Sequence, residues 1–355
     1  MRNLGLDLLR FLAIWLVLGR HLHMPNDPSS ILTAWFTGGW IGVDLFFVLS
    51  GFLVSGLLFK EYQKRQSLDI KRFLIRRGLK IYPPFYVLVA ATMLVRWVMD
   101  YPYTGKEVLA EIFFVQNYFQ GICRATWSLA VEEHFYIGIA ILFFFFVQNR
   151  QNKLTSLDPF LWIPKFCFFL MIACLCMRIM TMAYNPTYNM RLYLFASHLR
   201  IDSLFFGVFI SYLWHFKNLK HKTRSIPSLA LVALGICLLS PAFIFDVFKS
   251  NWISVYGVVL FYLGAGALLL AALRIESSQN RILQFIGYLG TTSYSTYLWH
   301  VPVYSWGWTF IKKTTGIENY IVYFIFYIFG SLFFGWLMNK LIEWPILKAR
   351  NRLFP

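Results

Sequence analysis

Arg10 and His21 are ionisable side chains within one apolar segment, residues 4–23. A charged side chain inside a membrane costs roughly 2.5–3.5 kcal/mol, so an ionisable residue at that depth is a candidate functional residue. Eleven helical steps separate the two residues, which corresponds to about 16 Å, or roughly half of a ~30 Å hydrocarbon core. The spacing predicts Arg10 towards one membrane surface and His21 towards the other. An imidazole can act as a general base, although a histidine near the surface can also be merely solvated.

Other apolar segments carry ionisable groups that are expected at a depth similar to that of His21. These groups are Asp44, Glu132, Glu133, His134, Arg200, Asp202 and His300. Their number predicts one polar cavity that several helices share. Arg200 and Asp202 are two residues apart and cannot face each other on a helix, so each is expected to pair with another helix. Structural roles stay open: Asp44 can pair, and His300 can belong to an aromatic belt.

Helical periodicity indicates which residues of the fourth apolar segment face the cavity. Ser128, Glu132 and Tyr136 recur every four residues and are predicted to share one helix face. Glu133 turns aside from that face, and Trp127 stands directly before it. A carboxylate in the first turn of a helix can also serve only to stabilise the helix dipole.

A basic stretch leads into the third apolar segment. It contains Arg72, Arg76, Arg77 and Lys80 and lies on the opposite side of the membrane from the predicted cavity. The last three fall within about one helical turn, and guanidinium groups suit phosphate oxygens. The alternative is that these residues set the membrane topology and contact anionic lipids.

The composition indicates an all-α, polytopic integral membrane protein. Of 355 residues, 58% are hydrophobic and only 14% are charged, whereas soluble domains carry about 25% charged residues. The net charge of +17 does not indicate a nucleic-acid partner, because the basic residues fall in short loops between apolar segments. Four of the five cysteines lie inside apolar segments, so neither a disulfide framework nor a metal site is expected.

About ten apolar segments of spanning length must position these residues. They are expected at 4–23, 38–59, 80–99, 129–147, 160–181, 193–214, 226–245, 252–273, 285–307 and 320–342. Residues 107–119 are too short to span and are expected to form a re-entrant or interfacial helix. Asp7 and Arg10 interrupt any signal-peptide pattern, so the first segment is expected to be retained. Residues 1–355 are expected to form a single membrane domain.

The distribution of basic residues predicts the orientation. Most basic residues outside the spans fall on one side, in loops 60–80 and 215–225 and near both ends of the chain. By the positive-inside rule, both termini are expected in the cytoplasm. The membrane is separately expected to be a bacterial inner membrane.

Four stretches together resemble a known family. They are Arg10 with His21, the run from Gly39 to Leu53 (GWIGVDLFFVLSGFL), the run from Arg76 to Pro83 (RRGLKIYP) and the run from Trp127 to Tyr136 (WSLAVEEHFY). In this order and spacing they resemble the membrane acyltransferase-3 family, and the resemblance covers about residues 3–345. Two positions depart from the family's pattern. Lys80 stands where arginine is usual, and His134 stands where glutamine is common, which leaves open whether His134 carries a proton.

The resemblance implies transfer of an acyl group, most often acetyl, from cytosolic acyl-coenzyme A to a hydroxyl of an extracytoplasmic carbohydrate or glycolipid. Arg10, Arg72, Arg76, Arg77 and Lys80 would then bind the donor. His21 would act as general base, oriented by Glu132 or Asp44, or would itself carry the acyl group. Ser50 or Ser128 could instead relay it. The residues expected to line the substrate cavity are Ser50, Trp127, Ser128, Glu133, Tyr136, Arg200, Asp202 and His300. No metal is expected, and the remaining partner would be membrane lipid.

Other functions also place charges inside a membrane. A transporter or flippase of a lipid-linked sugar would need a cavity but no thioester donor, and such proteins often show paired repeats that this sequence lacks. A glycan polymerase is expected to carry a larger outer loop than residues 100–126. A purely structural or receptor role does not explain why histidine, aspartate and glutamate meet at one depth.

Overall fold

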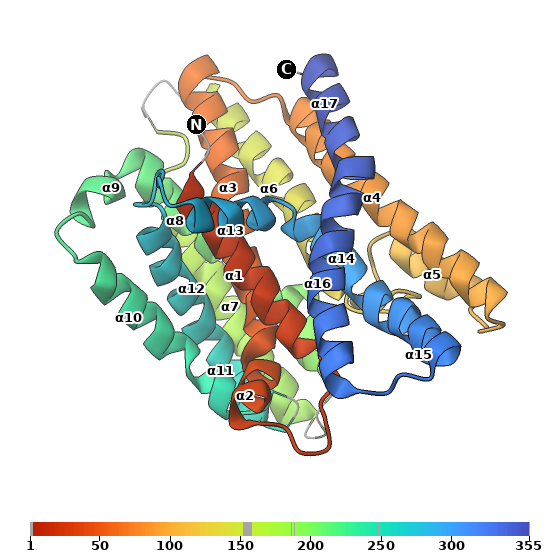
Figure 1. Ribbon diagram of the computed structural model, residues 1–355. Helices are drawn as coiled ribbons and strands as arrows, with labels where there is room; N and C mark the ends of the chain where they lie inside the picture. Colours follow the sequence, from red (N-terminus) through yellow and green to blue (C-terminus); the bar gives the residue numbers. More distant parts are fainter. Residues whose placement is uncertain (1–2, 152–157, 186, 188, 248, 355) are drawn as a thin grey trace.

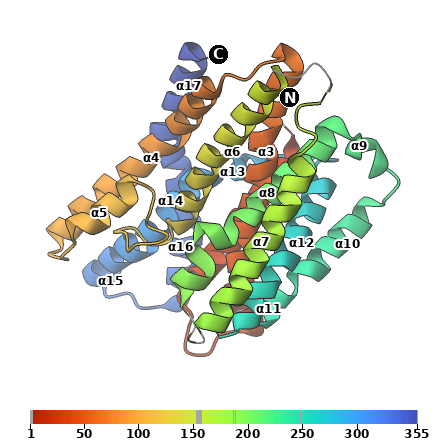
Figure 2. The same ribbon diagram turned by 180° about the vertical axis from the view of Figure 1, so that it is seen from behind.

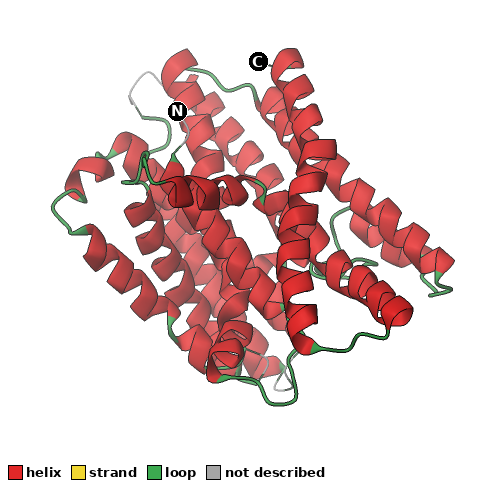
Figure 3. Cartoon of the chain, viewed as in Figure 1, coloured by secondary structure: helices red, strands yellow, loops and turns green. Residues whose placement is uncertain are grey.

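The computed structural model describes residues 3–151, 158–185, 187, 189–247 and 249–354. Every regular element within these residues is a helix, which confirms the expected all-α class (Figures 1 and 3). The first elements are α1 (Leu4–Arg20), α2 (Ser30–Gly38), η1 (Gly39–Ile41), α3 (Gly42–Arg65), α4 (Ile70–Val98), α5 (Gly105–Ile112), α6 (Trp127–Gln151) and α7 (Ile163–Tyr184).

The second part of the chain is built in the same way. Its elements are η2 (Arg191–Phe195), α8 (Ser197–Phe216), α9 (Leu219–Lys222), α10 (Ser228–Leu239), α11 (Pro241–Ile244), η3 (Ile253–Gly257), α12 (Val258–Ala272), α13 (Arg281–Thr291), α14 (Ser293–Pro302), η4 (Val303–Trp308), α15 (Thr309–Thr315), α16 (Tyr320–Met338), η5 (Asn339–Glu343) and α17 (Trp344–Leu353). The element η1 is a 3₁₀ turn, and η2 to η5 are single π-helical turns, which are often found near functional sites.

Seven described helical stretches are long and apolar enough to cross a membrane. They are Ser30–Arg65, Ile70–Val98, Trp127–Gln148, Ile163–Tyr184, Arg191–Phe216, Ile253–Ala272 and Tyr320–Leu353. The sequence predicted about ten spans because hydropathy does not register where a helix stops. The other three predicted segments are helical but are shorter or broken.

The three exceptions have local causes. Residues 4–23 form α1, which has 17 residues, and residues 226–245 form the short pair α10 and α11. Residues 285–307 are split at Thr292, where α13 ends and α14 begins. The helix expected at 107–119 is α5, which already ends at Ile112 because Phe114 adopts a positive φ of 54°.

The helices α3 and α8 form the centre of the bundle and contact each other backbone to backbone. A Cβ atom added at Gly51 would lie 1.9 Å from the carbonyl oxygen of Leu204, and one added at Gly207 would lie 2.2 Å from that of Val48. Only glycine permits this close approach. It brings the polar residues of α3 and α8 into one layer of the bundle.

Both chain termini lie towards one end of the bundle (Figures 1 and 2), and the helix α1 runs from that end towards the opposite end (Figure 1). Asn3 caps its start, because the side-chain oxygen accepts the N–H of Leu6 at 3.0 Å. Arg10 lies in the first half of α1 and donates to Asp7 at 2.5 Å. His21 follows the last residue of the helix. The predicted separation of Arg10 and His21 along one helix is therefore confirmed.

Candidate active site

A cavity of about 970 Å³ lies near both chain termini, because its lining includes Asn3 and Arg350. We call it the terminal-end cavity. Its lining includes these predicted site residues: Arg10, Ser50, Arg72, Arg76, Arg77, Lys80, Ser128, Glu132 and Tyr136. The volume lies near the upper end of the range for ligand pockets, about 300–1,000 Å³. The predicted donor-binding residues therefore do converge on one cavity.

The basic wall of this cavity comes from the first turns of α4. Asp69 caps α4 by accepting the N–H of Arg72 at 2.9 Å, which starts the helix directly before the basic residues. The guanidinium of Arg77 lies over the ring of Tyr136, with 5.6 Å between the central carbon and the ring centroid. Arg76 donates to the carbonyl oxygen of Phe354, and Leu347 and Arg350 of α17 line the cavity beside the basic wall.

A carboxylate faces the basic wall from α6. Glu132 accepts the hydroxyl of Ser50 at 3.0 Å and the hydroxyl of Tyr136 at 2.8 Å. The predicted common face of α6 is confirmed, because Ser128, Glu132 and Tyr136 all line this cavity. Glu133 turns aside as predicted and accepts the hydroxyl of Tyr82. Glu133 was also expected to line the substrate cavity, but it lines neither this cavity nor the second one described below.

A second cavity, of about 480 Å³, lies at the other end of α1. We call it the opposite-end cavity. Its lining includes His21, Trp127 and Arg200 from the predicted set. The wall segment, which we define as residues 113–126, contributes Gln116, Gln120, Gly121, Cys123, Arg124, Ala125 and Thr126. The prediction of a single polar cavity was therefore wrong, because the predicted residues divide between two cavities and a buried network.

The two cavities meet at Val43 and Tyr297, which line both of them. The Tyr297 hydroxyl donates to the carbonyl oxygen of Ala125 at 2.5 Å and lies 2.6 Å from the hydroxyl of Ser128. Ser128 lines the terminal-end cavity, whereas Ala125 lines the opposite-end cavity. Tyr297 therefore forms a partition that is bonded to the walls of both cavities.

His21 and His300 form a hydrogen-bonded pair beside this partition. Nδ1 of His300 lies 2.6 Å from the carbonyl oxygen of Tyr297, so it carries a proton, and Nε2 of the neutral ring is left as an acceptor. Nδ1 of His21 lies 3.0 Å from the carbonyl oxygen of Val17 and 3.2 Å from His300 Nε2, so it donates to both. These contacts select the tautomer of His21 in which Nε2 has a free lone pair, which is the form a general base needs.

The expectation that Asp44 or Glu132 orients His21 needs correction. Among the described residues, no hydrogen bond joins either carboxylate to the imidazole; His300 and the Val17 carbonyl take that place. The reason is the direction of each helix face: Glu132 faces the terminal-end cavity, and Asp44 faces α8. His134 contacts the hydroxyl of Ser197 at 2.6 Å and lines neither cavity.

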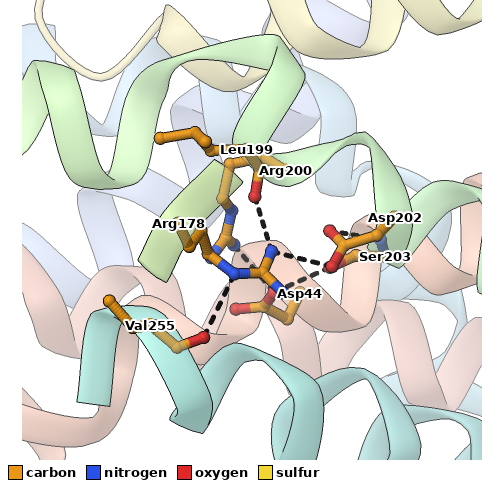
Figure 4. A network of polar contacts seen from close by, with 7 residues as sticks. All are labelled: Asp44, Arg178, Leu199, Arg200, Asp202, Ser203 and Val255. Atoms are coloured by element: carbon orange, nitrogen blue, oxygen red, sulfur yellow. Dashed lines mark hydrogen bonds and ion pairs between the residues drawn. The ribbon is translucent and has the colours of Figure 1, made fainter. Parts of the chain in front are cut away.

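Asp44 and Asp202 each pair with an arginine in a buried network (Figure 4). Arg200 donates to Asp44 at 2.7 Å, and Arg178 of α7 donates to Asp202 at 2.7 Å. The prediction that Arg200 and Asp202 pair with different helices is confirmed. Ser203 also donates to Asp44, at 3.3 Å. Arg200 lines the opposite-end cavity, whereas Asp44, Asp202 and the pair-forming His300 do not.

Arg178 is a member of this buried network that the sequence patterns did not single out. Its side chain is 1% exposed and also donates to the carbonyl oxygens of Leu199 and Val255. The available signal was an arginine inside the apolar segment 160–181. No group of three or more metal-ligating side chains is found in the part of the chain that the structure describes.

The wall segment is held by the buried carboxylate of Glu111, at the end of α5. One Glu111 oxygen accepts the N–H of Cys123 at 2.9 Å, and both accept the hydroxyl of Thr126, at 3.1 and 3.3 Å. A Cβ atom at Gly121 would lie 2.1 Å from that carboxylate. Burial disfavours the charged form and raises the pKa of Glu111 to about 7, although these hydrogen bonds lower it.

The raised pKa of Glu111 predicts a pH-dependent stability. The carboxyl ionises near pH 4.5 in the unfolded chain and near 7 in the folded one, so stability is expected to fall as the pH rises from 4.5 to 7. Glu111→Gln should remove this part of the slope in thermal unfolding between pH 4.5 and 7.5. The exposed carboxylate of Glu276 provides the control, because Glu276→Gln should leave the slope intact. An unchanged slope in Glu111→Gln would contradict the assignment.

Comparison with known proteins places this architecture in a family. A model of the acyltransferase-3 family, described as an acyltransferase domain, matches residues 3–340. The chain is 27% identical to the peptidoglycan O-acetyltransferase OatA of Listeria monocytogenes over 329 residues, which cover 84% of this chain and 49% of that protein. It is 28% identical to a Staphylococcus aureus protein named as a candidate O-acetyltransferase, over 97% of this chain and 57% of that protein.

A Bacillus subtilis protein named as a candidate peptidoglycan O-acetyltransferase, YrhL, is 26% identical over 84% of this chain and 48% of its own length. The chain thus spans about half the length of the curated relatives it matches. No solved structure matches it. The family match covers nearly all of the helical bundle and every lining residue of the two cavities except Leu347 and Arg350, so this multi-pass membrane protein belongs to the acyltransferase-3 family.

Proposed function

We propose that the protein transfers an acyl group from acyl-coenzyme A, bound in the terminal-end cavity, to a hydroxyl of a carbohydrate or glycolipid in the opposite-end cavity. The observation that carries this proposal is the pair of cavities that meet at Val43 and Tyr297. One cavity has the basic wall that an anionic donor requires, and the other contains an imidazole. This arrangement lets two substrates reach one point from opposite ends of the bundle.

The terminal-end cavity suits the chemistry of the donor. Arg72, Arg76, Arg77 and Lys80 form its basic wall, and phosphate oxygens would bind there. Lys80 supplies charge without the bidentate geometry of an arginine. Deeper in the cavity, Arg10, Ser50 and Glu132 offer both donors and acceptors for the amide groups of the coenzyme A arm.

His21 would act as the general base in the opposite-end cavity. Its Nε2 takes the proton of the acceptor hydroxyl while the hydroxyl oxygen attacks the thioester carbonyl carbon. The carbon–sulfur bond then breaks, the imidazolium returns the proton to the leaving thiolate, and the products are an ester and free coenzyme A. His300 would stabilise the imidazolium by accepting its Nδ1 proton in a hydrogen bond. This role replaces the one first expected of Asp44 or Glu132.

Two further observations support the proposed acceptor and orientation. The names of the relatives from L. monocytogenes and B. subtilis refer to peptidoglycan, which favours a cell-surface carbohydrate and a bacterial inner membrane. The excess of basic residues in loops 60–80 and 215–225 favours a cytoplasmic location for the end that holds the termini. Acyl-coenzyme A, and acetyl-coenzyme A in particular, is made in that compartment. The opposite-end cavity would then face the outside.

The test that separates this proposal from a flippase is release of coenzyme A. Purified protein in lipid nanodiscs is mixed with acetyl-coenzyme A, with and without a muropeptide or other cell-surface saccharide as acceptor. The proposal expects acceptor-dependent release of free thiol and a matching gain of one acetyl ester on the saccharide. Movement of a lipid-linked sugar with no thiol release would instead favour the transporter.

Neutralising the basic wall should weaken donor binding. Arg76→Gln with Arg77→Gln removes two groups whose hydrogen bonds to a phosphate contribute about 1.5–3 kcal/mol each, so the KM for acetyl-coenzyme A should rise at least roughly tenfold. The matched control is Arg224→Gln with Arg281→Gln, which removes two exposed arginines that line neither cavity. Equal donor KM values for the two double variants would assign Arg76 and Arg77 to lipid contact.

A further inference from the structure

The opposite-end cavity is rich in arginine and poor in acid. Arg20, Arg124, Arg191 and Arg200 line it, and the described lining contains no aspartate or glutamate. The nearest carboxylate bonded to this group is Asp44, which pairs with Arg200 from behind the lining. Among the described residues, Arg124 and Arg191 form no ion pair with a carboxylate, so the cavity keeps an excess of positive charge after the Arg200–Asp44 pair is counted.

The positive charge of this cavity contrasts with the rest of the chain, in which most basic residues are expected at the other end of the bundle. The end of the bundle at which this cavity lies carries few basic residues, because most of them are in loops 60–80 and 215–225 and near the chain termini. Arg124 and Arg191 are two of these few, and both line the cavity. All four basic side chains are arginines rather than lysines, and arginine is the residue that binds carboxylate and phosphate with two parallel hydrogen bonds.

Several buried polar atoms of the lining have no partner. Arg200 is fully buried, and its Nη2 donates to Asp44, whereas its Nε and Nη1 make no hydrogen bond within the part of the chain that the structure describes. The same holds for Nε1 of Trp40 and Oε1 of Gln116, which line the same cavity. A buried polar group without a hydrogen-bond partner destabilises the empty cavity. Donors outnumber acceptors among these atoms, so a ligand with acceptor oxygens would satisfy most of them.

Aromatic rings complete the lining. The central guanidinium carbon of Arg200 lies 6.0 Å from the ring centroids of both Trp40 and Trp127. Trp127 is itself stacked on Phe195, with 4.6 Å between centroids. Ligand pockets typically combine aromatic surfaces with a few charged groups. A sugar ring suits such a pocket because its faces are apolar and its edges carry hydroxyl groups.

From these observations we infer that the opposite-end cavity selects an anionic saccharide, one whose sugar carries a carboxylate or a phosphate near the hydroxyl to be acylated. The inference deepens the proposed function and rests on it for the role of this cavity as the acceptor site. Arg200 and Trp40 would bind the sugar deep in the cavity, and Arg124 and Arg191 at the rim would bind its charge.

The test measures saccharide binding without any donor. Full-length protein in nanodiscs of zwitterionic lipid is titrated with four matched probes: methyl glucuronide, its methyl ester, methyl glucoside and methyl glucoside 6-phosphate. The two anionic probes should bind about tenfold more tightly than the two neutral ones, as expected for a hydrogen bond to a charged group. Added salt should weaken binding of the anionic probes alone.

Two double variants locate the effect. Arg124→Gln with Arg191→Gln should abolish the preference for the anionic probes, whereas Lys106→Gln with Lys313→Gln should keep it. Lys106 and Lys313 are exposed, line no part of this cavity and are expected at the same end of the bundle. Their replacement therefore removes the same number of positive charges without changing the cavity. Equal affinity for the acid and its ester, no saccharide binding, or an unchanged preference in the first double variant would overturn the inference.

The saccharide titration contains no acyl-coenzyme A, so its result does not depend on whether the protein transfers acyl groups. Failure of the inference and failure of the proposed function can therefore be told apart. Efficient acyl transfer to neutral and anionic saccharides alike would overturn the inference and leave the proposed function intact. A preference for anionic probes in a protein that releases no coenzyme A with any of them would support the charged site and overturn the acyltransferase assignment.

Discussion

His21→Ala is expected to lower the rate of acyl transfer by about 10²–10⁴-fold, the usual contribution of a general base. The KM for acetyl-coenzyme A should change little, because His21 lines the opposite-end cavity and the basic residues line the other. The measurement is kcat and KM for each substrate with purified protein in nanodiscs. A loss confined to kcat would separate the chemical role from a role in binding the donor.

His23 provides the matched control for this experiment. It is exposed, lies two residues from His21 and lines neither cavity, so His23→Ala should keep normal transfer. Under the proposed mechanism, His300 acts through His21 and is therefore a positioning residue. His300→Leu should lower kcat, and His300→Gln should recover part of it, because an amide oxygen can also accept the Nδ1 proton. Full kcat in His21→Ala at a normal protein level would refute the general-base assignment.

Arg178→Met is expected to destabilise the protein by about 3–5 kcal/mol, the usual cost of removing one partner of a buried ion pair. The change leaves the Asp202 carboxylate, which is 0% exposed, without its arginine. It also removes the hydrogen bonds that Arg178 makes to the carbonyl oxygens of α8 and η3. The measurement is the free energy of unfolding in mixed micelles, with the midpoint of thermal unfolding as a second readout.

A second substitution distinguishes loss of the pair from loss of packing. Asp202→Asn in the Arg178→Met background removes the uncompensated charge, so it should restore a large part of the lost stability. Lys165→Met is the control on the same helix, because Lys165 lies towards the start of α7 and outside the network, and it should change stability little. If Arg178→Met and Lys165→Met were equally stable, the buried network would contribute nothing to the fold.

Helical periodicity predicted the parts of the site that depend on one helix. The common face of Ser128, Glu132 and Tyr136 and the divergence of Arg200 from Asp202 both follow from 3.6 residues per turn. The all-α class followed from composition in the same way. These features need no knowledge of which helices are neighbours.

The remaining features depend on contacts between distant parts of the chain. His21 and His300 are 279 positions apart, and only the packed structure brings their rings together. The same is true of Arg178 and Asp202, which meet because α7 packs against α8. Depth alone suggested that Asp44 and Glu132 would meet His21, but depth does not specify which way a helix face points. Hydropathy also failed to register the break at Thr292.

Val43 and Tyr297 also bear on the permeability of the membrane. The two cavities reach towards each other from opposite ends of the bundle, and each is lined by several positive charges. Without the partition, these charges would form a continuous path for small anions such as chloride. The apolar side chain of Val43 and the Tyr297 hydroxyl, bonded on both sides, interrupt that path. Under the proposed function, the partition would act as an electrical seal, and the acyl group would have to pass it without opening a conducting pore.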